Sequence, residues 1–214
     1  MEPLRLADHP DVEPLVRPRG ESQRARLLVA AFDVVGERGI QGIAVADIVG
    51  AAGVSRGTFY DMFASKEDCF VAAYRYARDI LLEVVNTATR DAMGGWQDGL
   101  RAAIRAYLRA LAYSPRFARA GLVEIQNAGD LGQAEHDISV SRFASAYGWL
   151  FHQGQKEDSK LQMPTPEALF VLVAGFEHLV AMRVREGGRD KITQLEESLI
   201  AVSSAVFLGW REGA

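Results

Sequence analysis

Residues suited to binding another molecule are concentrated just after Ser55. The pattern predicts a helix over residues 56–62, and the Ser55 hydroxyl can cap it by accepting a hydrogen bond from a free backbone amide. Phe59 and Phe63 lie four residues apart and predict the inward side of this helix. The side chains left facing outward are Arg56, Thr58 and Tyr60. An arginine in such a place can bind guanine through two parallel hydrogen bonds, so the indicated chemistry is recognition.

A second short helix must hold this segment in place. The spacing predicts it over residues 46–52, with one apolar face. That face carries Val45, Ile48, Val49 and Ala52. Gly53 ends the helix, because glycine adopts left-handed backbone at little cost, and Val54 then enters the corner. Two short helices joined by such a turn form a helix-turn-helix, which places its second helix in the major groove of DNA.

The same residues carry a family resemblance. The run Ala51-Ala52-Gly53-Val54-Ser55-Arg56-Gly57-Thr58-Phe59-Tyr60, followed by Phe63 and Ser65-Lys66-Glu67, resembles the DNA-binding signature of the TetR family of bacterial transcriptional regulators. This signature is more specific than a general helix-turn-helix pattern. Beyond it, the chain is similar to the family only in its layout of helices.

The resemblance implies DNA contacts residue by residue. The residues that match contact positions are Ser55, Arg56, Gly57, Thr58, Tyr60 and Lys66. Arg56, Gly57 and Thr58 match positions near base edges, whereas Tyr60 and Lys66 match positions that hold phosphates; the serine serves as cap, phosphate contact or both. Lys66 also has a physical argument, since an ammonium group at a helix N-terminus opposes the helix dipole unless an external anion offsets it.

Four positions depart from the family pattern. Ala44 stands where a threonine usually caps the first short helix and touches a phosphate, and Ala46 lacks the polar contact that some members make. Asp61 and Met62 occupy positions that are often basic, aromatic or histidine. Asp61 would repel phosphates or accept a hydrogen bond from cytosine. We therefore expect weaker backbone binding and a greater need for both halves of a DNA site.

Composition sets limits on the class of protein. With 214 residues, 49% of them hydrophobic, the chain can bury a sizeable helical core. Its net charge of -4 does not mark a nucleic-acid binder, so DNA binding must depend on local charge. The basic run nearest the motif comprises Arg17, Arg19, Arg24 and Arg26. The single cysteine, Cys69, excludes an internal disulfide and fits a reducing cytoplasm.

The pattern along the chain predicts an all-α protein. Residues 1–20 are rich in proline and alternating charge and predict a flexible N-terminal arm; residues 21–75 predict a three-helix DNA-binding domain that begins with an amphipathic helix over 21–39. Residues 76–214 predict a helical ligand-binding and dimerisation domain. No signal peptide or apolar run of membrane-spanning length is apparent, so we expect a cytoplasmic protein without a membrane partner.

Helices are also expected throughout the second domain. The pattern places them at residues 96–113, 117–127, 133–153, 167–186 and 192–210, with Gly129 and Gly132 as breaks. The last two are apolar over more of their circumference than a surface helix needs. They either fill the domain centre or build a subunit interface. The resemblance implies the second, a homodimer formed through the last two helices.

A pocket between these helices is the expected site for a small-molecule effector. Aromatic candidates for its lining are Tyr107, Phe117, Trp149 and Phe176, and polar candidates are Glu124, Asn127, His152 and Glu177. Ordinary core packing is the competing interpretation of each residue. The aromatic content favours a hydrophobic ligand.

Motifs for catalysis, metal binding or a cofactor are not found. The sequence has no phosphate-binding loop, no HExxH, no GxSxG and no CxxC, and its four histidines are scattered. We therefore expect a regulator and not an enzyme: a repressor released from a palindromic operator by a small hydrophobic ligand. The alternative is a ligand-binding or scaffolding protein of the same fold that does not bind an operator.

Overall fold

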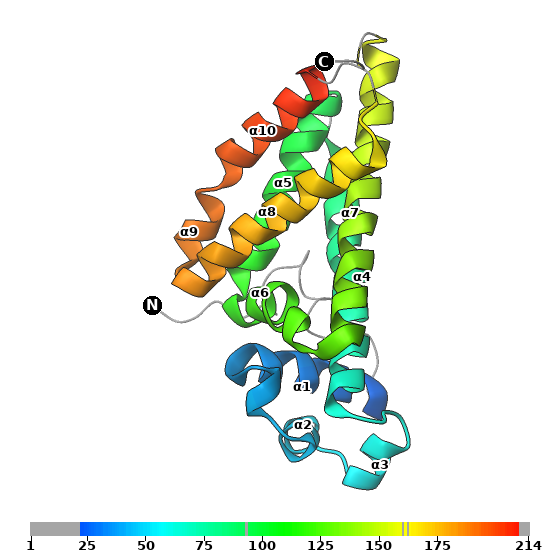
Figure 1. The fold of residues 1–214 in the computed structure, drawn as a ribbon, viewed down its shortest axis with the longest axis vertical. Coiled ribbons are helices and arrows are strands. Elements are labelled where there is room, and N and C mark those ends of the chain that lie inside the picture. Colours follow the sequence, from blue (N-terminus) through cyan, green and yellow to red (C-terminus); the bar gives the residue numbers. More distant parts are fainter. Residues whose placement is uncertain (1–21, 93, 160, 162, 210–214) are drawn as a thin grey trace. The chain divides into compact units, whose positions relative to one another are not determined.

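Every element assigned in the described part of the chain is helical (Figure 1). The residues that the computed structural model describes are 22–92, 94–159, 161 and 163–209. The predicted all-α class is therefore confirmed. The expected arm over residues 1–20 lies outside the described residues, and so do Arg17 and Arg19.

The described residues divide into two compact units. The first contains residues 22–81 and 113–137, and the second contains residues 82–112 and 138–209. The single domain boundary expected after residue 75 stays a prediction. The compact units have different limits because a segment from the middle of the chain packs on the N-terminal helices.

Two stretches of chain supply the helices of the first unit. They are α1 (Gln23–Arg38), η3 (Ile40–Gly42), α2 (Val45–Ala52), α3 (Arg56–Tyr60), the first part of α4 (Lys66–Asp91), α6 (Pro115–Leu122), η4 (Glu124–Asn127) and the first part of α7 (Gly129–Glu157). Leu27, Ile48, Phe59 and Phe70 are fully buried in its core. Complete burial of such a side chain contributes about 1.5–3 kcal/mol to stability.

Helix α6 packs closely against α1. Gly36 lies inside α1 without a side chain, and a Cβ atom there would collide with the backbone carbonyl of Arg116 in α6. Beside this contact, the Phe32 and Phe117 rings have their centroids 5.2 Å apart. Phe117 is therefore a core residue of the first unit, where it covers α1.

Several helix limits differ from those expected. The helix expected over residues 117–127 is α6 followed by the separate 3-10 helix η4. The break expected at Gly132 is wrong, because α7 continues through it. A Cβ atom at Gly132 would collide with the Ile125 carbonyl, so glycine serves close packing here and not helix termination. The last expected helix is divided into α9 (Arg189–Thr193) and α10 (Glu196–Gly209).

The second unit combines α5 (Trp96–Tyr113), α8 (Pro166–Glu186), α9 and α10 with the later parts of α4 and α7. Phe207 of α10 stacks on Trp96 with ring centroids 4.9 Å apart, and it also stacks on Phe151 of α7. These rings join α5, α7 and α10. Among the described residues, no helix has both the length and the apolar character needed to cross a membrane.

Candidate nucleic-acid interface and effector cavity

Helix α3 separates its side chains as the sequence predicts. Phe59 is fully buried and contacts the Phe63 ring with centroids 5.7 Å apart, whereas Arg56 is exposed and Tyr60 is 57% exposed. The predicted cap is also present, because Ser55 Oγ accepts a hydrogen bond from the Thr58 backbone amide at 3.0 Å. The helix spans five residues and not the seven expected. The buried Phe59 and the Ser55 cap nevertheless hold the outward face of this helix in place.

The hydroxyl groups of Ser55 and Thr58 are bonded to each other. Their oxygens lie 2.9 Å apart, and either group can donate. Gly57 between them is exposed. The structure thus brings the predicted residues from Ser55 to Tyr60 together on one short segment, with these two hydroxyls already sharing a hydrogen bond.

Helix α2 begins without the usual threonine cap. A carboxylate oxygen of Asp47 instead accepts the Ala44 backbone amide at 2.7 Å, and the other oxygen pairs with Arg38 at 2.8 Å. These contacts, first the backbone hydrogen bond and then that from Arg38, lower the pKa of Asp47. The end of α2 is as expected, because Gly53 has the left-handed φ of 62°. Asp47 therefore satisfies the Ala44 amide, while its own amide, which a threonine cap would bind, donates to the Ala44 carbonyl oxygen at 3.0 Å.

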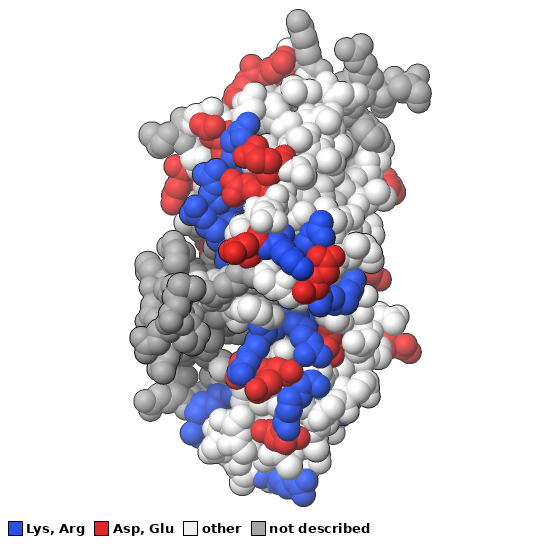
Figure 2. Space-filling model, turned by 90° about the vertical axis from the view of Figure 1, so that its left-hand side faces the viewer, with Lys and Arg blue, Asp and Glu red and all other residues white. Residues whose placement is uncertain are grey.

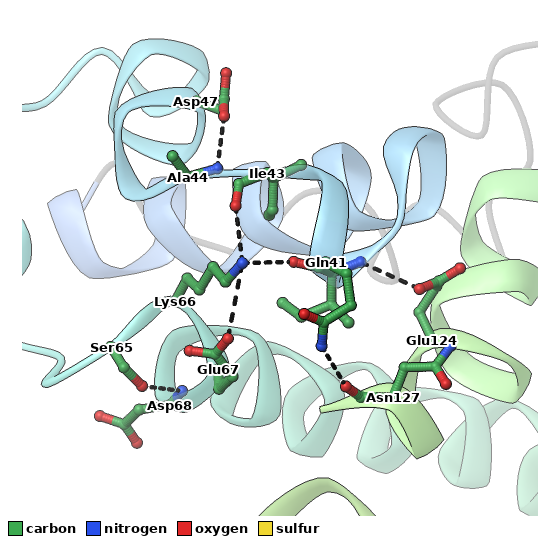
Figure 3. A network of polar contacts seen from close by, with 11 residues as sticks. Gln41, Ile43, Ala44, Asp47, Ser65, Lys66, Glu67, Asp68, Glu124 and Asn127 are labelled. Atoms are coloured by element: carbon green, nitrogen blue, oxygen red, sulfur yellow. Dashed lines mark hydrogen bonds and ion pairs between the residues drawn. The ribbon is translucent and has the colours of Figure 1, made fainter. Parts of the chain in front are cut away.

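Lys66 lies in a different setting from the one expected (Figure 3). Its Nζ donates hydrogen bonds to the carbonyl oxygens of Ile40 and Ile43, both at 2.8 Å, and lies 3.8 Å from a Glu67 carboxylate oxygen. The side chain is 21% exposed. The ammonium group therefore has internal acceptors in place of the external anion that we expected. Its contact with a phosphate stays a prediction.

Two arginines beside the helix-turn-helix are absent from the predicted contact set. The Arg24 guanidinium lies over the Phe63 ring, 5.5 Å from the ring centroid, and Arg26 extends towards the Gly53 turn. Both side chains are exposed at the beginning of α1. In the sequence, their place in the basic run near the motif was the signal that could have added them to the predicted contacts. They are positive groups near α3 that could contact phosphates.

Much of the charge of the first unit is paired. Arg116 of α6 contacts Glu37 at 2.9 Å and Asp33 at 3.4 Å, both on α1. In the view of Figure 2, Lys and Arg side chains lie among Asp and Glu side chains and do not form one continuous basic surface. This pattern agrees with the acidic net charge of the chain.

The eight predicted effector-contacting residues are divided between the two units. Phe117, Glu124 and Asn127 belong to the first unit. Glu124 is buried and accepts hydrogen bonds from the Ile40 amide and Arg119, while the Asn127 carbonyl accepts one from Gln41 (Figure 3). These residues therefore bind α6 and η4 to the segment before α2.

Two further candidates, Trp149 and His152, are on α7 in the second unit and have exposed side chains. The other three, Tyr107, Phe176 and Glu177, line a cavity of about 40 Å³ in that unit. The whole lining consists of Val85, Ala103, Ile104, Tyr107, Phe143, Tyr147, Val173, Phe176, Glu177 and Leu199. The wall residues that the sequence did not indicate are mainly aliphatic, and no motif distinguishes them from ordinary core positions.

Among the described residues, no group of three or more His, Cys, Asp or Glu side chains is placed to hold a metal ion.

The buried Cys69 lies in the first unit. Burial, followed by the charge of Asp68, raises the pKa of its thiol to about 12, so the thiolate is not formed near neutral pH.

Residues 27–73 match the family described as bacterial regulatory proteins, tetR family. The transcriptional activator FasR of Mycolicibacterium smegmatis, described as HTH-type, is 36% identical over 90 residues, which are 42% of this chain and 40% of that protein. The chain thus aligns with less than half of this relative.

Two solved structures share the fold over most of their length. FadR from Bacillus halodurans, a fatty acid degradation regulator, has a TM-score of 0.74 at 18% identity, with 89% of this chain and 96% of that chain covered. FadR from Bacillus subtilis, in complex with stearoyl-CoA, has a TM-score of 0.73 at 16% identity, with coverages of 87% and 98%. The helix-turn-helix segment of this chain therefore matches the TetR family, and the described chain shares the fold of these two solved regulators.

Proposed function

We propose that this chain is a cytoplasmic, dimeric repressor that binds a near-palindromic operator through α3 and leaves it when a small hydrophobic effector binds the second unit. The observation that carries the proposal is the arrangement of α3. Phe59 fixes the helix from within, while Arg56 and Tyr60 extend outward. Arg56 then reads a base edge, and Tyr60 positions the helix on the phosphate backbone.

Gly57 supports a close approach of DNA to α3. A Cβ atom there would make only an ordinary contact of 3.6 Å with Ser55 Oγ, so packing inside the protein does not require glycine. A base edge or sugar-phosphate backbone lying directly against the helix would favour it. Arg24 adds a phosphate contact beside Phe63 and compensates for the inward orientation of Lys66.

Exposed apolar side chains on α8 and α10 support a homodimer. On α8, Val171 is 70% exposed, and the exposed residues Gly175, His178 and Met182 follow on the same helix face. On α10, Val202 and Leu208 are exposed, and so is Ala205 between them. Such faces are stabilised by a second copy that removes them from water. In a two-fold dimer the two α3 helices would lie about 34–36 Å apart, in successive major grooves.

Effector control would operate by a shift between two dimer states. A ligand that binds one state more tightly moves the population towards it, by no more than the difference in affinity allows. The name of the Bacillus subtilis FadR complex gives an example of a small molecule held by this fold. The repressor assignment comes from the family resemblance, whereas the relative FasR is named an activator. An operator-reporter assay with and without the chain determines the sign.

The alternative is a ligand-binding or scaffolding protein of this fold without an operator. It is favoured by Ala44, which cannot contact a phosphate, by the exposed Asp61 at the end of α3, and by the internal hydrogen bonds of Lys66. Selection from a pool of random DNA duplexes separates the two functions. The regulator should enrich an inverted repeat with half-sites one helical turn, or a multiple of it, apart. Failure to enrich any sequence would support the alternative.

A matched pair of variants then tests the role of α3. Arg56→Ala should lower operator affinity about 10-fold to 100-fold and relax the preference at one base position. Arg101→Ala removes an exposed arginine of the second unit and should leave operator binding unchanged. Arg24→Ala should weaken operator and random DNA alike and reduce the salt slope by about one. If Arg56→Ala bound the operator as tightly as the unmodified chain, α3 would not have the proposed role.

A further inference from the structure

A larger hollow of the second unit lies between α7 and the beginning of α8. This hollow, the α7–α8 groove, has a volume of about 570 Å³. Its described walls come from α7 around Ser145, from Met163 and Pro164, and from the first turns of α8 as far as Val171. Glu167 is the one charged residue among them, whereas Met163 and Val171 expose apolar side chains to water. A charge-poor hollow with exposed apolar walls is typical of a surface that another molecule covers.

The groove continues into the α8 face proposed for the homodimer. Val171 belongs to both, because it lines the groove and begins the exposed row that ends at Met182. On the other wall, Trp149 is 48% exposed and lies four residues after Ser145, so it extends the same face of α7 by one turn. The groove and the exposed α8 face therefore form one continuous surface within a single unit.

The exposed faces of α8 and α10 leave room for further contact area in a dimer. The row from Val171 to Met182 is about 17 Å long, and so is the exposed face of α10 over residues 198–209. With a width of about 10 Å per helix, the two faces offer roughly 350 Å² per copy in projection. A stable interface usually buries about 800 Å² on each partner. Additional apolar contact would therefore stabilise the dimer, and the α7–α8 groove adjoins the α8 face.

The end of α10 has the chemistry that such a groove accepts. None of residues 198–209 is charged, and Leu208 in the last turn is 62% exposed. Ala205 and Gly209 near it are also exposed, and both are small, so they leave the leucine side chain accessible to a partner. Removal of this side chain from water is favourable.

The order of the helices brings this end of α10 to the start of α8 in a two-fold dimer. Within the second unit, α9 joins the end of α8 to the start of α10, so α8 begins and α10 ends at the same end of the unit (Figure 1). A two-fold axis that runs along these helices places the start of α8 in one copy level with the end of α10 in the other. Such an interface makes each contact twice.

We propose that the α7–α8 groove takes the last turn of α10 from a second copy of this chain, with Leu208 of the partner subunit against the α8 wall. The volume lies in the range of about 300–1,000 Å³ that holds drug-sized ligands, so it has room for the side chains of one helix turn. The proposal deepens the proposed function and rests on its homodimer, not on operator binding. It adds α7 to an interface that the sequence placed on the last two helices.

The rim of the groove agrees with this occupant. Glu167 is exposed in the first turn of α8, where it can stay in water at the edge of an interface. One chain exposes both apolar surfaces, and association of two copies removes both from water. An unrelated protein or a small molecule in the groove would leave the end of α10 exposed, so a cross-link between the two surfaces distinguishes these occupants.

Cysteine cross-linking between two single variants tests the contact directly. One chain carries Ser145→Cys and the other Leu208→Cys, both at sites exposed in one copy. The native Cys69 is buried and its thiol stays protonated near neutral pH, so it does not compete. After exchange of subunits, a short thiol-reactive cross-linker should give a covalent dimer in the mixture and several-fold less with each chain alone. Ser145→Cys mixed with Gln194→Cys, an exposed site at the end of α9, should also give little product.

A charge in the groove should weaken the dimer. In Ser145→Glu each isolated copy should stay folded because the site is exposed, but in the dimer the carboxylate would be buried against Leu208 of the partner subunit. We expect the dissociation constant of the dimer, measured by sedimentation equilibrium, to rise about 10-fold to 100-fold. Gln133→Glu, at an exposed site of α7 outside the groove, should leave that constant unchanged.

Two results would each overturn the proposal: a Ser145→Glu variant that dimerises like the unmodified chain, or cross-linking in the mixture no stronger than in the Gln194→Cys control. A dimer that survives Ser145→Glu but not Val202→Asp would refute the groove contact alone and keep the α8 and α10 faces as the interface. An unmodified chain that is a monomer would refute the homodimer and the groove contact together. Neither measurement uses DNA, so a chain that passes both but selects no DNA sequence refutes the operator function alone.

Discussion

The Nζ atom of Lys66 donates a hydrogen bond to the carbonyl oxygen of Ile40 at 2.8 Å. The amide of the same isoleucine donates to a Glu124 carboxylate oxygen at 3.1 Å (Figure 3). Residues from α4 and η4 thus bind the two polar groups of one fully buried residue in η3. Because η3 directly precedes α2, these side chains fix the entry to the helix-turn-helix.

Removal of the Lys66 ammonium should therefore lower stability. In Lys66→Ala the Ile40 and Ile43 carbonyls lose a charged donor, and we expect the free energy of unfolding to fall by about 2 kcal/mol. Urea denaturation followed by circular dichroism measures this change. Lys156→Ala, at an exposed lysine of α7, should change stability by less than about 0.5 kcal/mol. Unchanged stability of Lys66→Ala together with weaker binding to all DNA would instead assign Lys66 to a phosphate.

The helix-turn-helix could be predicted from sequence because its signals are local. Gly53 in left-handed conformation, Ser55 as cap and the buried pair Phe59 and Phe63 all act within a few residues of one another. Such local signals can be read directly from the order of residues. The spacing of apolar residues did not separate α9 from α10, because it continues across the short break between them.

The role of Lys66 needed information that the local pattern lacks. Its acceptors lie 26 and 23 residues earlier in the chain, and only the packed structure brings those carbonyls within reach. The same limit explains Phe117 and Glu124. Helical spacing indicates which side of a helix is buried, but not that α1 and η3 would cover these two residues.

The exposed apolar faces of α8 and α10 give a test of the homodimer. Val171→Asp and Val202→Asp place a charge at sites that are exposed in one chain, so each isolated subunit should stay folded. In a dimer the same charge would be buried without a partner, which is strongly unfavourable. Sedimentation equilibrium should show a dimer for the unmodified chain and for Gln97→Asp, a matched exposed site. It should show monomers for the two valine variants; persistent dimers would place the interface elsewhere.

The contact of Glu135 with Arg75 and Arg78 predicts a stability difference that depends on pH. Its carboxylate oxygens lie 2.7 Å and 3.2 Å from the two guanidinium groups, and both Glu135 and Arg78 are buried. The hydrogen bond from Arg75 is the largest cause that lowers the pKa of Glu135, and the positive charges add to it. A lowered pKa in the folded state stabilises the fold above the unfolded pKa. That contribution is lost as pH falls through the folded value.

The free energy of unfolding of Glu135→Gln should therefore be about 2 kcal/mol lower than that of the unmodified chain at neutral pH, because Arg78 loses its buried counter-charge and keeps only its pair with Asp79 at 3.0 Å. The deficit should shrink as pH falls below about 4.5, the region in which the glutamate takes up its proton on unfolding. Glu83→Gln is the control, since its ion pair with Arg90 is exposed and contributes about 0.5 kcal/mol or less. Denaturant titrations at a series of pH values measure both differences. A Glu135→Gln deficit that stays constant into acid would show that packing, and not charge, makes the contribution.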